Sequence, residues 1–506
     1  MQVVTASEMR MLEKETMAEL GLTELLLMEN AGAEIVRVLE ARFGNLRDKR
    51  VHILVGGGNN GGDGLVVARH LLAKNARPKV YLVGDQTKFT QANRTNLAIL
   101  KKLNGNITTI TEQSLPKLKF SLSLADMVVD ALLGTGLEGP LRKDLAVIVD
   151  TVNEVNRPVA AVDVPTGVNS TTGAVENTAV RADLTIGLGL LKVGCLVYPG
   201  REYVGDYEVV SLGVPLMGVQ DIKRFLLDES CLKRLPDRPD WGHKGTFGHT
   251  LVVAGSRSMA GAAALCGKAV LRGGGGLVTL AIPQSIASRF SPDEIIVAPI
   301  PDTDEGTFGK QSVSPLKELY TGKDVLVIGP GLSQDSQIQT VVEQLLMAWS
   351  GPAVIDADGL NVLTLDFLER ISPSKRKQWV FTPHPGEMGR LIGKSAQHIN
   401  ENRLQTAWEF GEKWKVTLVL KGAPTVISGR GKLYINSTGN HGMGTGGMGD
   451  VLTGLIGALL SQGMPPVEAG AVGAYVHGLA GDYVGQQGKR GLTATDCLQA
   501  IQRILQ

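Results

Sequence analysis

The stretch R-V-H-I-L-V-G-G-G-N-N-G-G-D-G-L, residues Arg50–Leu65, decides how the first half of this chain is expected to fold. It opens with a short apolar run, passes into a glycine-dense loop, and continues into a segment that predicts a helix over 65–74. A short apolar run followed by glycines and a helix is typical of a strand-to-helix turn in a parallel sheet. The sequence therefore predicts an α/β fold here.

The same loop contains a literal G-x-G-x-x-G pattern at Gly56, Gly58 and Gly61, the spacing of a Rossmann dinucleotide-binding turn. The next predicted strand, 79–83, is followed by Asp85, near the offset at which such folds place a ribose-binding acid. One hypothesis is therefore an NAD-dependent dehydrogenase. Because so short a pattern also occurs in unrelated proteins, a non-catalytic ligand-binding domain is a second hypothesis.

Side-chain oxygens gather at several predicted strand ends of this half. Asn60 lies in the glycine loop, Asp130 ends another predicted strand, and Asp163 and Thr166 follow a third. Because ligands of an open parallel sheet collect at the carboxyl ends of its strands, we expect these four residues to share one site. Such oxygens are the ligands of a hard cation. Further strands are predicted at 127–131, 159–164 and 183–187.

The second half repeats the alternation of strands and helices. The segment Asp228–Gly248 loses periodicity and holds prolines and charges, so we place a linker there, after an antiparallel piece expected at Tyr203–Val214. Two domains result, residues 1–225 and 226–506. Strands are predicted at 249–255, 277–282, 324–328, 353–357, 379–382 and 416–420, and helices at 260–272, 467–483 and 495–505.

A second glycine loop, N-S-T-G-N-H-G-M-G-T-G-G-M-G-D-V-L-T-G at Asn436–Gly454, runs directly into an apolar helix. Successive backbone N–H groups and the positive end of the helix dipole would hold phosphate oxygens there. Asp450 is then a carboxylate beside phosphate, a costly place for a negative charge unless it holds a metal or removes a proton from a hydroxyl. The alternative is a surface turn with an Asp N-cap.

Several polar residues also have structural interpretations. Ser7 is expected to cap a first helix, and Leu25–Phe43 carries a second in which Glu29 and Asn30 are polar exceptions in an apolar stripe. His384 and His441 lie in predicted loops, where a lone histidine is more often solvated than functional.

Composition favours a soluble globular protein that acts on small molecules. Among 506 residues, 51 Lys and Arg balance 50 Asp and Glu, which gives no electrostatic reason to expect nucleic acid or an anionic membrane as a partner. The four cysteines are far apart, without metal-binding spacing, and residues 1–5 lack the features of a signal peptide. We expect a reduced, cytoplasmic setting and no membrane span.

Taken together, the motifs resemble a known pairing of families. The first half resembles the YjeF N-terminal family of NAD(P)H-hydrate epimerases through G-N-N-G-G-D-G at 58–64, V-D-A at 129–131 and D-V-P-T-G at 163–167. The second half is similar to ADP-dependent NAD(P)H-hydrate dehydratases of the ribokinase-like superfamily through H-P-G-E at 384–387, K-G-A-P at 421–424 and the loop at 439–450. The resemblance implies a Rossmann-like three-layer α/β/α sandwich followed by a ribokinase-like α/β/α domain.

The resemblance also implies an activity and its ligands. Water adds to the nicotinamide ring of NADH or NADPH to give a hydrate with two epimers; the first domain would interconvert them, and the second would dehydrate the S epimer using ADP or ATP, with Mg²⁺. Asp450 is the expected base for phosphoryl transfer, and Asp163 is the candidate acid or base for epimerisation, where it could equally hold the ribose. We expect a homo-oligomer, although the sequence does not fix the number of copies.

The resemblance assigns further residues by group. Potassium would be bound by Asn60, Asp130 and Thr166. The hydrate would contact Asn59, Asn60, Gly61, Gly62, Asp63, Gly134, Thr135, Gly136, Leu137, Glu138, Gly139, Pro140 and Asp163 in the first domain. In the second it would contact Ala262, Gly331, His384 and Asp450, while Lys421, Gly422, Ala423, Pro424, Thr425 and Gly449 would hold the nucleotide.

The glycine loop departs from the family pattern at two positions. Where the family has Gly-Asn-Pro-Gly-Met-Ala-Thr-Gly-Gly, this chain has His441 in place of Pro and Gly444 in place of Ala. Both changes loosen the loop, which leaves the choice between ADP and ATP open. A small-molecule kinase of the same superfamily, fused to a Rossmann-like ligand-binding domain, is the alternative function, because an anion hole with an Asp base would also serve simple phosphorylation.

Overall fold

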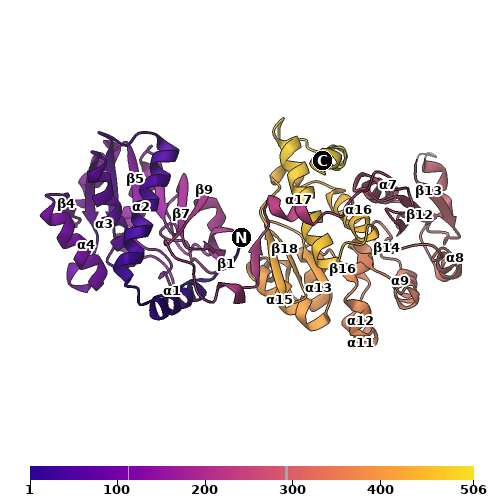
Figure 1. Cartoon of the computed structure of the whole chain (residues 1–506). Helices are drawn as coiled ribbons and strands as arrows, with labels where there is room; N and C mark the ends of the chain where they lie inside the picture. Colours follow the sequence, from indigo (N-terminus) through magenta and orange to yellow (C-terminus); the bar gives the residue numbers. More distant parts are fainter. Residues whose placement is uncertain (112, 291–293, 506) are drawn as a thin grey trace. The chain divides into compact units, whose positions relative to one another are not determined.

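The structure is a computed structural model that describes residues 1–111, 113–290 and 294–505. The chain divides into two compact units, Met1–Arg224 and Phe225–Gln506, and each is described by itself. Both are α/β units with helices on the two faces of a mostly parallel sheet (Figure 1).

The first unit contains a seven-stranded parallel sheet in the order β4-β3-β2-β5-β6-β7-β9. Its strands are β2 (Arg50–Val55), β3 (Arg77–Leu82), β4 (Asn106–Thr109), β5 (Met127–Ala131), β6 (Val159–Val162), β7 (Leu184–Leu188) and β9 (Asp206–Val210). Two short strands, β1 (Val3–Val4) and β8 (Leu191–Lys192), pair with each other outside this sheet. The predicted parallel sheet is confirmed.

Side chains alternate between the two faces of this sheet, so each strand contributes to two cores. Ile53 and Val55 of β2 pack with α2 and α3, whereas Leu54 between them packs with α5 and α6. Burial on both faces explains why these strands read as continuous apolar runs. The helices are α1 (Ala6–Leu20), α2 (Glu24–Phe43), α3 (Asn59–Ala73), α4 (Gln91–Lys102), α5 (Leu115–Ser123) and α6 (Lys143–Glu154).

Two local predictions for the first unit are wrong. The N-cap of α1 is Thr5, which forms a capping box with Glu8, whereas Ser7 already lies within the helix. The antiparallel piece expected at Tyr203–Val214 contains β9, which pairs with β7 in parallel. Short strand patterns carry no signal of direction. The capping-box offset fits Thr5, because Glu8 lies three residues later, whereas Arg10 stands three residues after Ser7.

The second unit contains a ten-stranded sheet in the order β10-β19-β18-β17-β16-β15-β14-β11-β12-β13. The strands from β13 to β17 in this order run in parallel, and β18 and β19 add antiparallel. Their bounds are β10 (Arg224–Leu226), β11 (His249–Val253), β12 (Leu277–Pro283), β13 (Ile296–Ile300), β14 (Val325–Ile328), β15 (Ala353–Ile355), β16 (Trp379–Phe381), β17 (Thr417–Leu420), β18 (Thr425–Gly429) and β19 (Lys432–Asn436).

Helices cover both faces of this second sheet. One face is covered by α7 (Ala260–Arg272), α16 (Met448–Ser461), α17 (Pro466–Gly485) and α18 (Ala494–Ile504), which share a core with alternate residues of the strands. On β18, Ile427 faces α17 while Ser428 faces α15. The other helices are α8 (Val313–Glu318), α9 (Ser336–Ala348), α10 (Ala357–Asn361), α11 (Leu365–Arg370), α12 (Pro373–Arg376), α13 (Pro385–Ile392), α14 (Ala396–Glu401) and α15 (Arg403–Trp414).

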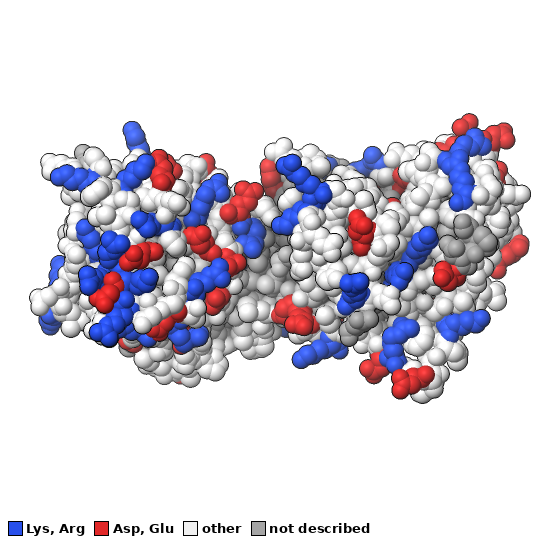
Figure 2. Space-filling model, turned by 90° about the horizontal axis from the view of Figure 1, so that it is seen from above, with Lys and Arg blue, Asp and Glu red and all other residues white. Residues whose placement is uncertain are grey.

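The linker prediction at Asp228–Gly248 is wrong, because this segment lies inside the second unit. β10 already pairs with β19, and Cys231 is buried in the core of that unit. Loss of periodicity reflected short 3₁₀ turns, such as Glu229–Arg234, that pack on the core. None of the described helices is both long and apolar enough to cross a membrane. On the face shown in Figure 2, acidic and basic side chains are interspersed.

Candidate active sites

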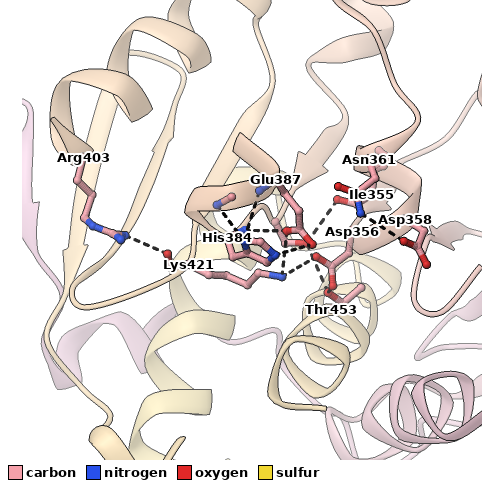
Figure 3. A network of polar contacts seen from close by, with 11 residues as sticks. Ile355, Asp356, Asp358, Asn361, His384, Glu387, Arg403, Lys421 and Thr453 are labelled. Carbon is pink, nitrogen blue, oxygen red and sulfur yellow. Dashed lines mark hydrogen bonds and ion pairs between the residues drawn. The ribbon is translucent and has the colours of Figure 1, made fainter. Parts of the chain in front are cut away.

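Neighbouring strands of the second unit bring charged side chains together at their carboxyl ends (Figure 3). Asp356 follows β15 and is buried, and Lys421 follows β17. The Lys421 ammonium lies 2.7 Å from Asp356 Oδ1, and the hydroxyl of Thr453 in α16 donates to Oδ2 at 2.7 Å. Asp356 thus ties two strands and the helix after the glycine loop to one another.

The turn after β16 adds a second buried carboxyl group. The backbone N–H of His384 donates to Glu387 Oε2 at 2.8 Å, and that of Gly386 donates to His384 Nδ1 at 3.0 Å. Nδ1 is therefore an acceptor, so the imidazole proton lies on Nε2, 3.3 Å from Glu387 Oε1. Glu387 Oε2 lies 3.9 Å from the Lys421 ammonium.

Burial and mutual charge set the protonation of this cluster. Burial raises the pKa of Glu387 to about 7, with Lys421 opposing the rise and Asp356 adding to it. Burial would lower the pKa of Lys421, but the charges of Asp356 and Glu387 outweigh it and raise that pKa. Burial, with the charge of Lys421, lowers the pKa of His384, so its ring is neutral at pH 7.

Asp450 lies in the first turn of α16, directly after the glycine loop. Gly447, with φ +89°, begins this helix, and a Cβ on Gly449 would lie 3.1 Å from the Lys421 ammonium. Burial, and next the charge of Asp356, raise the pKa of Asp450 to about 7. A carboxyl group that exchanges its proton near neutral pH has the property required of a general base.

Two predicted residues from distant segments meet beside this helix. A Cβ on Gly331, whose φ is +65°, would lie 3.2 Å from the side chain of Ala262 in α7. One turn further along α7, Leu265 lies within 2.6 Å of a Cβ built on Gly447. The start of α7, the loop after β14 and the glycine loop therefore meet.

The loop Lys421–Thr425 is held in place by the buried guanidinium of Arg403 in α15. Its Nη1 donates to the carbonyl oxygens of Lys421 at 3.0 Å and Pro424 at 3.1 Å, and its Nη2 donates to Asn400 at 2.8 Å. Burial lowers the pKa of Arg403 to about 10. Gly422, at φ +137°, approaches the guanidinium so closely that a Cβ would clash with it.

The other end of the glycine loop is anchored to α17. Asp482 accepts from the backbone N–H of Gly439 at 2.8 Å and from the Asn440 amide at 3.1 Å. His441 follows and is exposed. His477, also in α17, is buried, and its Nε2 has no hydrogen-bond partner. Burial, with the charge of Lys421, lowers the pKa of His477 to about 4, so it is neutral.

In the first unit, three predicted cation ligands lie in or next to buried strand ends. Asp130 accepts hydrogen bonds from the backbone N–H of Thr166 at 2.8 Å and from its hydroxyl at 2.7 Å. Burial raises the pKa of Asp130 to about 6. Asn60 lies in the first turn of α3, and both polar atoms of its buried amide lack hydrogen-bond partners among the described residues. A buried amide without partners is costly, so this one is placed to meet a ligand.

Asp163 and Asn60 both approach Gly134. A Cβ on Gly134 would lie 3.2 Å from the Asn60 amide oxygen and 3.4 Å from Asp163 Oδ2. Asp63 is buried nearby, and burial together with the charge of Asp163 raises its pKa well above the usual value. Burial likewise raises the pKa of Glu13 in α1 to about 7, with Lys192 opposing this rise and Asp163 adding to it.

The other residues of the predicted hydrate set differ in exposure and in their contacts within the protein. Asn59 is exposed and its amide donates to Glu24. A Cβ on Gly61 would meet the carbonyl oxygen of Gly56, and one on Gly62 would meet Met28, so both glycines permit close packing. In the loop 134–140, Leu137 packs against the core on the α5–α6 face, and residues Gly136, Glu138 and Pro140 are exposed.

Three polar residues weighed at the sequence level have local partners. Glu29 pairs with His70 at 2.8 Å and with Arg69, and Asn30 donates to the carbonyl of Leu212 at 2.9 Å, so both half-buried side chains have partners within the protein. Asp85 is exposed and caps a short 3₁₀ turn by accepting from Thr87.

Several polar and charged residues of the two candidate sites carried no signal in the sequence. The sequence patterns gave no role to Asp356, at the end of a predicted strand, or to Glu387, in the H-P-G-E motif, and no signal for Arg403, Thr453, His477, Glu13 or Lys192. Each of the last five lies inside a helix or a strand, where apolar periodicity is the main signal and a single polar residue carries none of its own.

Comparison with known proteins identifies the family of each half of the chain. A family model described as YjeF-related protein N-terminus matches residues 24–194, and one described as NAD(P)H-hydrate dehydratase matches residues 250–503. A solved ADP/ATP-dependent NAD(P)H-hydrate dehydratase from Bacillus subtilis is 28% identical, covering 56% of this chain and 97% of its own, with a TM-score of 0.48.

Two full-length relatives carry the same name. The bifunctional NAD(P)H-hydrate repair enzyme Nnr of Moorella thermoacetica is 41% identical, over 100% of this chain and 97% of its own length. The enzyme of that name from Thermofilum pendens is 38% identical, over 100% and 96%. This chain therefore belongs to the family of bifunctional NAD(P)H-hydrate repair enzymes.

Proposed function

We propose that the chain repairs hydrated nicotinamide cofactors in two steps. The first unit interconverts the R and S epimers of NADH hydrate and NADPH hydrate, and the second dehydrates the S epimer at the expense of ADP or ATP. The observation that carries the second step is Asp450, a carboxyl group with a pKa of about 7 that directly follows the glycine loop, next to Gly449, where a Cβ would lie 3.1 Å from the Lys421 ammonium. Family membership supports the pairing of the two activities.

The chemistry of dehydration explains why this carboxyl group is needed. Hydroxide leaves a ring carbon poorly, whereas phosphate leaves well. Asp450 takes the proton of the ring hydroxyl while the hydroxyl oxygen attacks the terminal phosphorus of the nucleotide. Backbone N–H groups of the glycine loop stabilise the transferring phosphoryl group. The lone pair of the ring nitrogen then expels phosphate, and loss of a proton from the adjacent carbon restores the dihydropyridine.

The surrounding residues divide between the two ligands. We assign the loop Lys421–Thr425 and Gly449 to the nucleotide, because the Lys421 ammonium lies against Gly449 at the helix start. Ala262, Gly331 and His384 are assigned to the hydrate. Among the described residues, no group of three or more acidic, His or Cys side chains is placed to hold a metal ion. Mg²⁺ would therefore be held mainly by the nucleotide phosphates and water, as this ion often is.

For the first unit we propose a potassium site and an acid or base. Potassium would be held by Asn60, Asp130 and Thr166; the unpartnered oxygen of the buried Asn60 amide supports this, because a hard cation would satisfy it. The cation would fix the position of the hydrate. Asp163 would exchange a proton with the hydrate, supported by its place beside Gly134 and Asn60. Residues 59–63 and 134–140 would form the remaining walls.

One assay tests this proposal against a simple kinase. Purified protein is incubated with S-NADH hydrate, Mg²⁺ and either ADP or ATP, and the absorbance of reduced nicotinamide and the release of inorganic phosphate are followed together. Equal amounts of NADH and phosphate are expected. A stable phosphorylated hydrate without NADH would show a kinase instead. Starting from pure R epimer, with and without potassium, tests the first unit, where repair should require the cation.

A further inference from the structure

Lys192 is a fully buried lysine in the first unit, with 1% of its surface exposed. An ammonium is almost never buried unless it is paired, because removing it from water is costly. Its Nζ lies 2.5 Å from Asp163 Oδ1 and donates to the carbonyl oxygen of Leu188 at 2.6 Å. The side chain therefore has two fixed partners, and one of them is the proposed acid or base.

The geometry of Asp163 distinguishes its two carboxylate oxygens. Oδ1 faces Lys192 and also accepts from the backbone N–H of Leu188 at 3.1 Å. Oδ2 has no hydrogen-bond partner in the described part of the chain, and it lies on the side of Gly134 and the unpartnered Asn60 amide. One oxygen is thus occupied by the protein, and the other is available to a ligand.

The backbone around both residues fixes this arrangement. Asp163 has φ +67°, a left-handed conformation that is uncommon for a residue other than glycine, and its N–H donates to Ile186 at 2.8 Å. Lys192 ends β8, where it pairs with Val4 of β1. Strain of this kind persists where surrounding contacts hold it, often at functional sites.

We propose that Lys192 is the positioning residue of the epimerase site. It occupies Oδ1 of Asp163, so that Oδ2 alone exchanges a proton with the hydrate. This inference rests on the proposed function, in which Asp163 acts as acid or base, and it adds the atom that reacts and the residue that holds that atom in place.

The proton exchange is sufficient for epimerisation by ring opening. Oδ2 takes the proton of the ring hydroxyl, the carbon–oxygen double bond of an aldehyde forms, and the carbon–nitrogen bond breaks with its electron pair moving to the ring nitrogen. That negative charge is delocalised through the ring double bond into the carboxamide. After the aldehyde turns over, the nitrogen attacks its other face, and Oδ2 returns the proton to the oxygen.

The test compares Lys192→Met, Lys192→Gln and Lys192→Arg in the full chain, starting from pure R-NADH hydrate and separating the epimers by chromatography. Lys192→Met is expected to lower kcat for epimerisation by about 100-fold, in the range typical of a misplaced acid or base, with KM changed less than about threefold. Lys192→Arg should restore at least about tenfold over Met, because it keeps a charged donor.

Controls separate this inference from the proposed function. Dehydration of the S epimer by the second unit measures active protein in every sample, and Lys79→Met, a change of the same kind at a partly buried lysine that donates to Ser121, should leave epimerisation unchanged. If Asp163→Asn abolishes epimerisation while Lys192→Met and Lys192→Gln do not slow it, the positioning role is wrong. If Asp163→Asn is fully active in epimerisation, the proposed acid or base role of Asp163 is wrong, whatever the Lys192 variants show.

A purely structural role would give a different pattern. In that case the melting temperature of the first unit and kcat would fall together in Lys192→Met, and Arg would rescue the rate no better than Gln does. That result would also overturn the proposal.

Discussion

At the scale of single residues, the proposed dehydratase site has more carboxyl groups around Lys421 than this one ammonium can neutralise. Three carboxyl groups, Asp356, Glu387 and Asp450, raise the pKa of this partly buried ammonium. Asp356 makes the close ion pair at 2.7 Å and also accepts from Thr453. Asp450 and Glu387 are left with elevated pKa values, so two of the three carboxyl groups can change protonation near neutral pH.

Asp450→Asn is expected to abolish dehydration and to leave nucleotide binding largely intact. Loss of a general base costs about 10²- to 10⁴-fold in rate, whereas main-chain groups of the glycine loop should still hold the phosphates. NADH formation from the S epimer and calorimetric binding of ADP measure the two effects. Asp304→Asn, the same change at an exposed carboxylate of the same unit, is the control. Loss of both properties together would show that Asp450 acts through the metal or the fold.

The rate of dehydration is expected to depend on pH through Asp450. Because the base must be deprotonated and its pKa is about 7, kcat should fall about tenfold per pH unit well below 7 and level off above it. Glu387 titrates in the same range, so the profile is repeated with Glu387→Gln. An unchanged acidic limb in that variant assigns the limb to Asp450. Its disappearance would assign the limb to Glu387.

The same carboxyl group is expected to limit stability. Its pKa is raised in the folded state from an ordinary value near 3.8 to about 7, so the folded state binds its proton more tightly and stability falls as pH rises from 4 to 7. Asp450→Asn removes the cost of ionising this buried carboxyl group. The melting temperature should therefore rise by several degrees at pH 8, and this increase should disappear near pH 4. Calorimetry without nucleotide measures it, and an equal gain at both pH values would contradict this account.

The sequence placed residues of the proposed sites where a loop motif marked them. Asp450 followed a glycine loop, and Asp163 followed a predicted strand, so strand-end logic was enough. It could not supply Lys192, which lies 29 positions after Asp163, or Thr453, which lies inside an apolar helix. These partners depend on which strands become neighbours, and that is a property of the tertiary fold.

At the scale of secondary-structure elements, α15 contacts the loop Lys421–Thr425, the proposed nucleotide-binding segment, through the side chain of Arg403. Arg403 donates to carbonyl groups at both ends of the segment Lys421–Pro424, and it has no carboxylate partner among the contacts of its guanidinium in the described residues. A loop held in this way is fixed before the nucleotide arrives. Preorganisation lowers the entropic cost of binding.

Arg403→Met is expected to weaken nucleotide binding by about tenfold or more and to destabilise the second unit by about 2 kcal/mol, because several buried carbonyl groups lose their donor. Arg403→Lys should recover little, since one ammonium cannot replace a fork of donors. The KM for ADP and thermal melting are the measurements. Arg430→Met, at the exposed turn between β18 and β19, is the matched control. A normal KM in Arg403→Met would show that the loop is held by other contacts.

The order of elements was predictable, but the pairing of the less regular ones was not. The strands 50–55 and 127–131 and the helix 260–272 lie where the apolar patterns predicted them. β9 was expected in an antiparallel piece but pairs in parallel with β7. No strand was predicted at β10, which lies at the boundary between the two predicted domains. Short strands at sheet edges have too few residues for alternation to fix direction or partner.

At the scale of the whole molecule, two units with separate sheets and separate cores carry the two proposed steps. The S epimer made by the first unit is the substrate of the second. Each site is built from residues of its own unit, so the reactions need only a shared solution of hydrate.

Complementation in a mixture tests this independence. A chain with Asp163→Asn and another with Asp450→Asn should each fail to convert R-NADH hydrate to NADH above the rate of spontaneous epimerisation. Mixing them in equal amounts should restore about half or more of the activity of the unaltered protein at saturating substrate. Failure of the mixture, with each remaining single activity intact, would show that the hydrate must pass between sites of one chain.

The pairing of β1 with β8 links the epimerase site to the order of protein synthesis. Val3 and Val4 lie about 190 residues before their partners Leu191 and Lys192. At a translation rate of roughly 5–20 residues per second, Lys192, which faces Asp163, is synthesised about 10 to 40 s after β1. A nascent chain stalled before residue 192 would hold the glycine loop and its asparagines but would lack a fixed carboxylate. Epimerase activity should therefore arise late in the synthesis of the first unit.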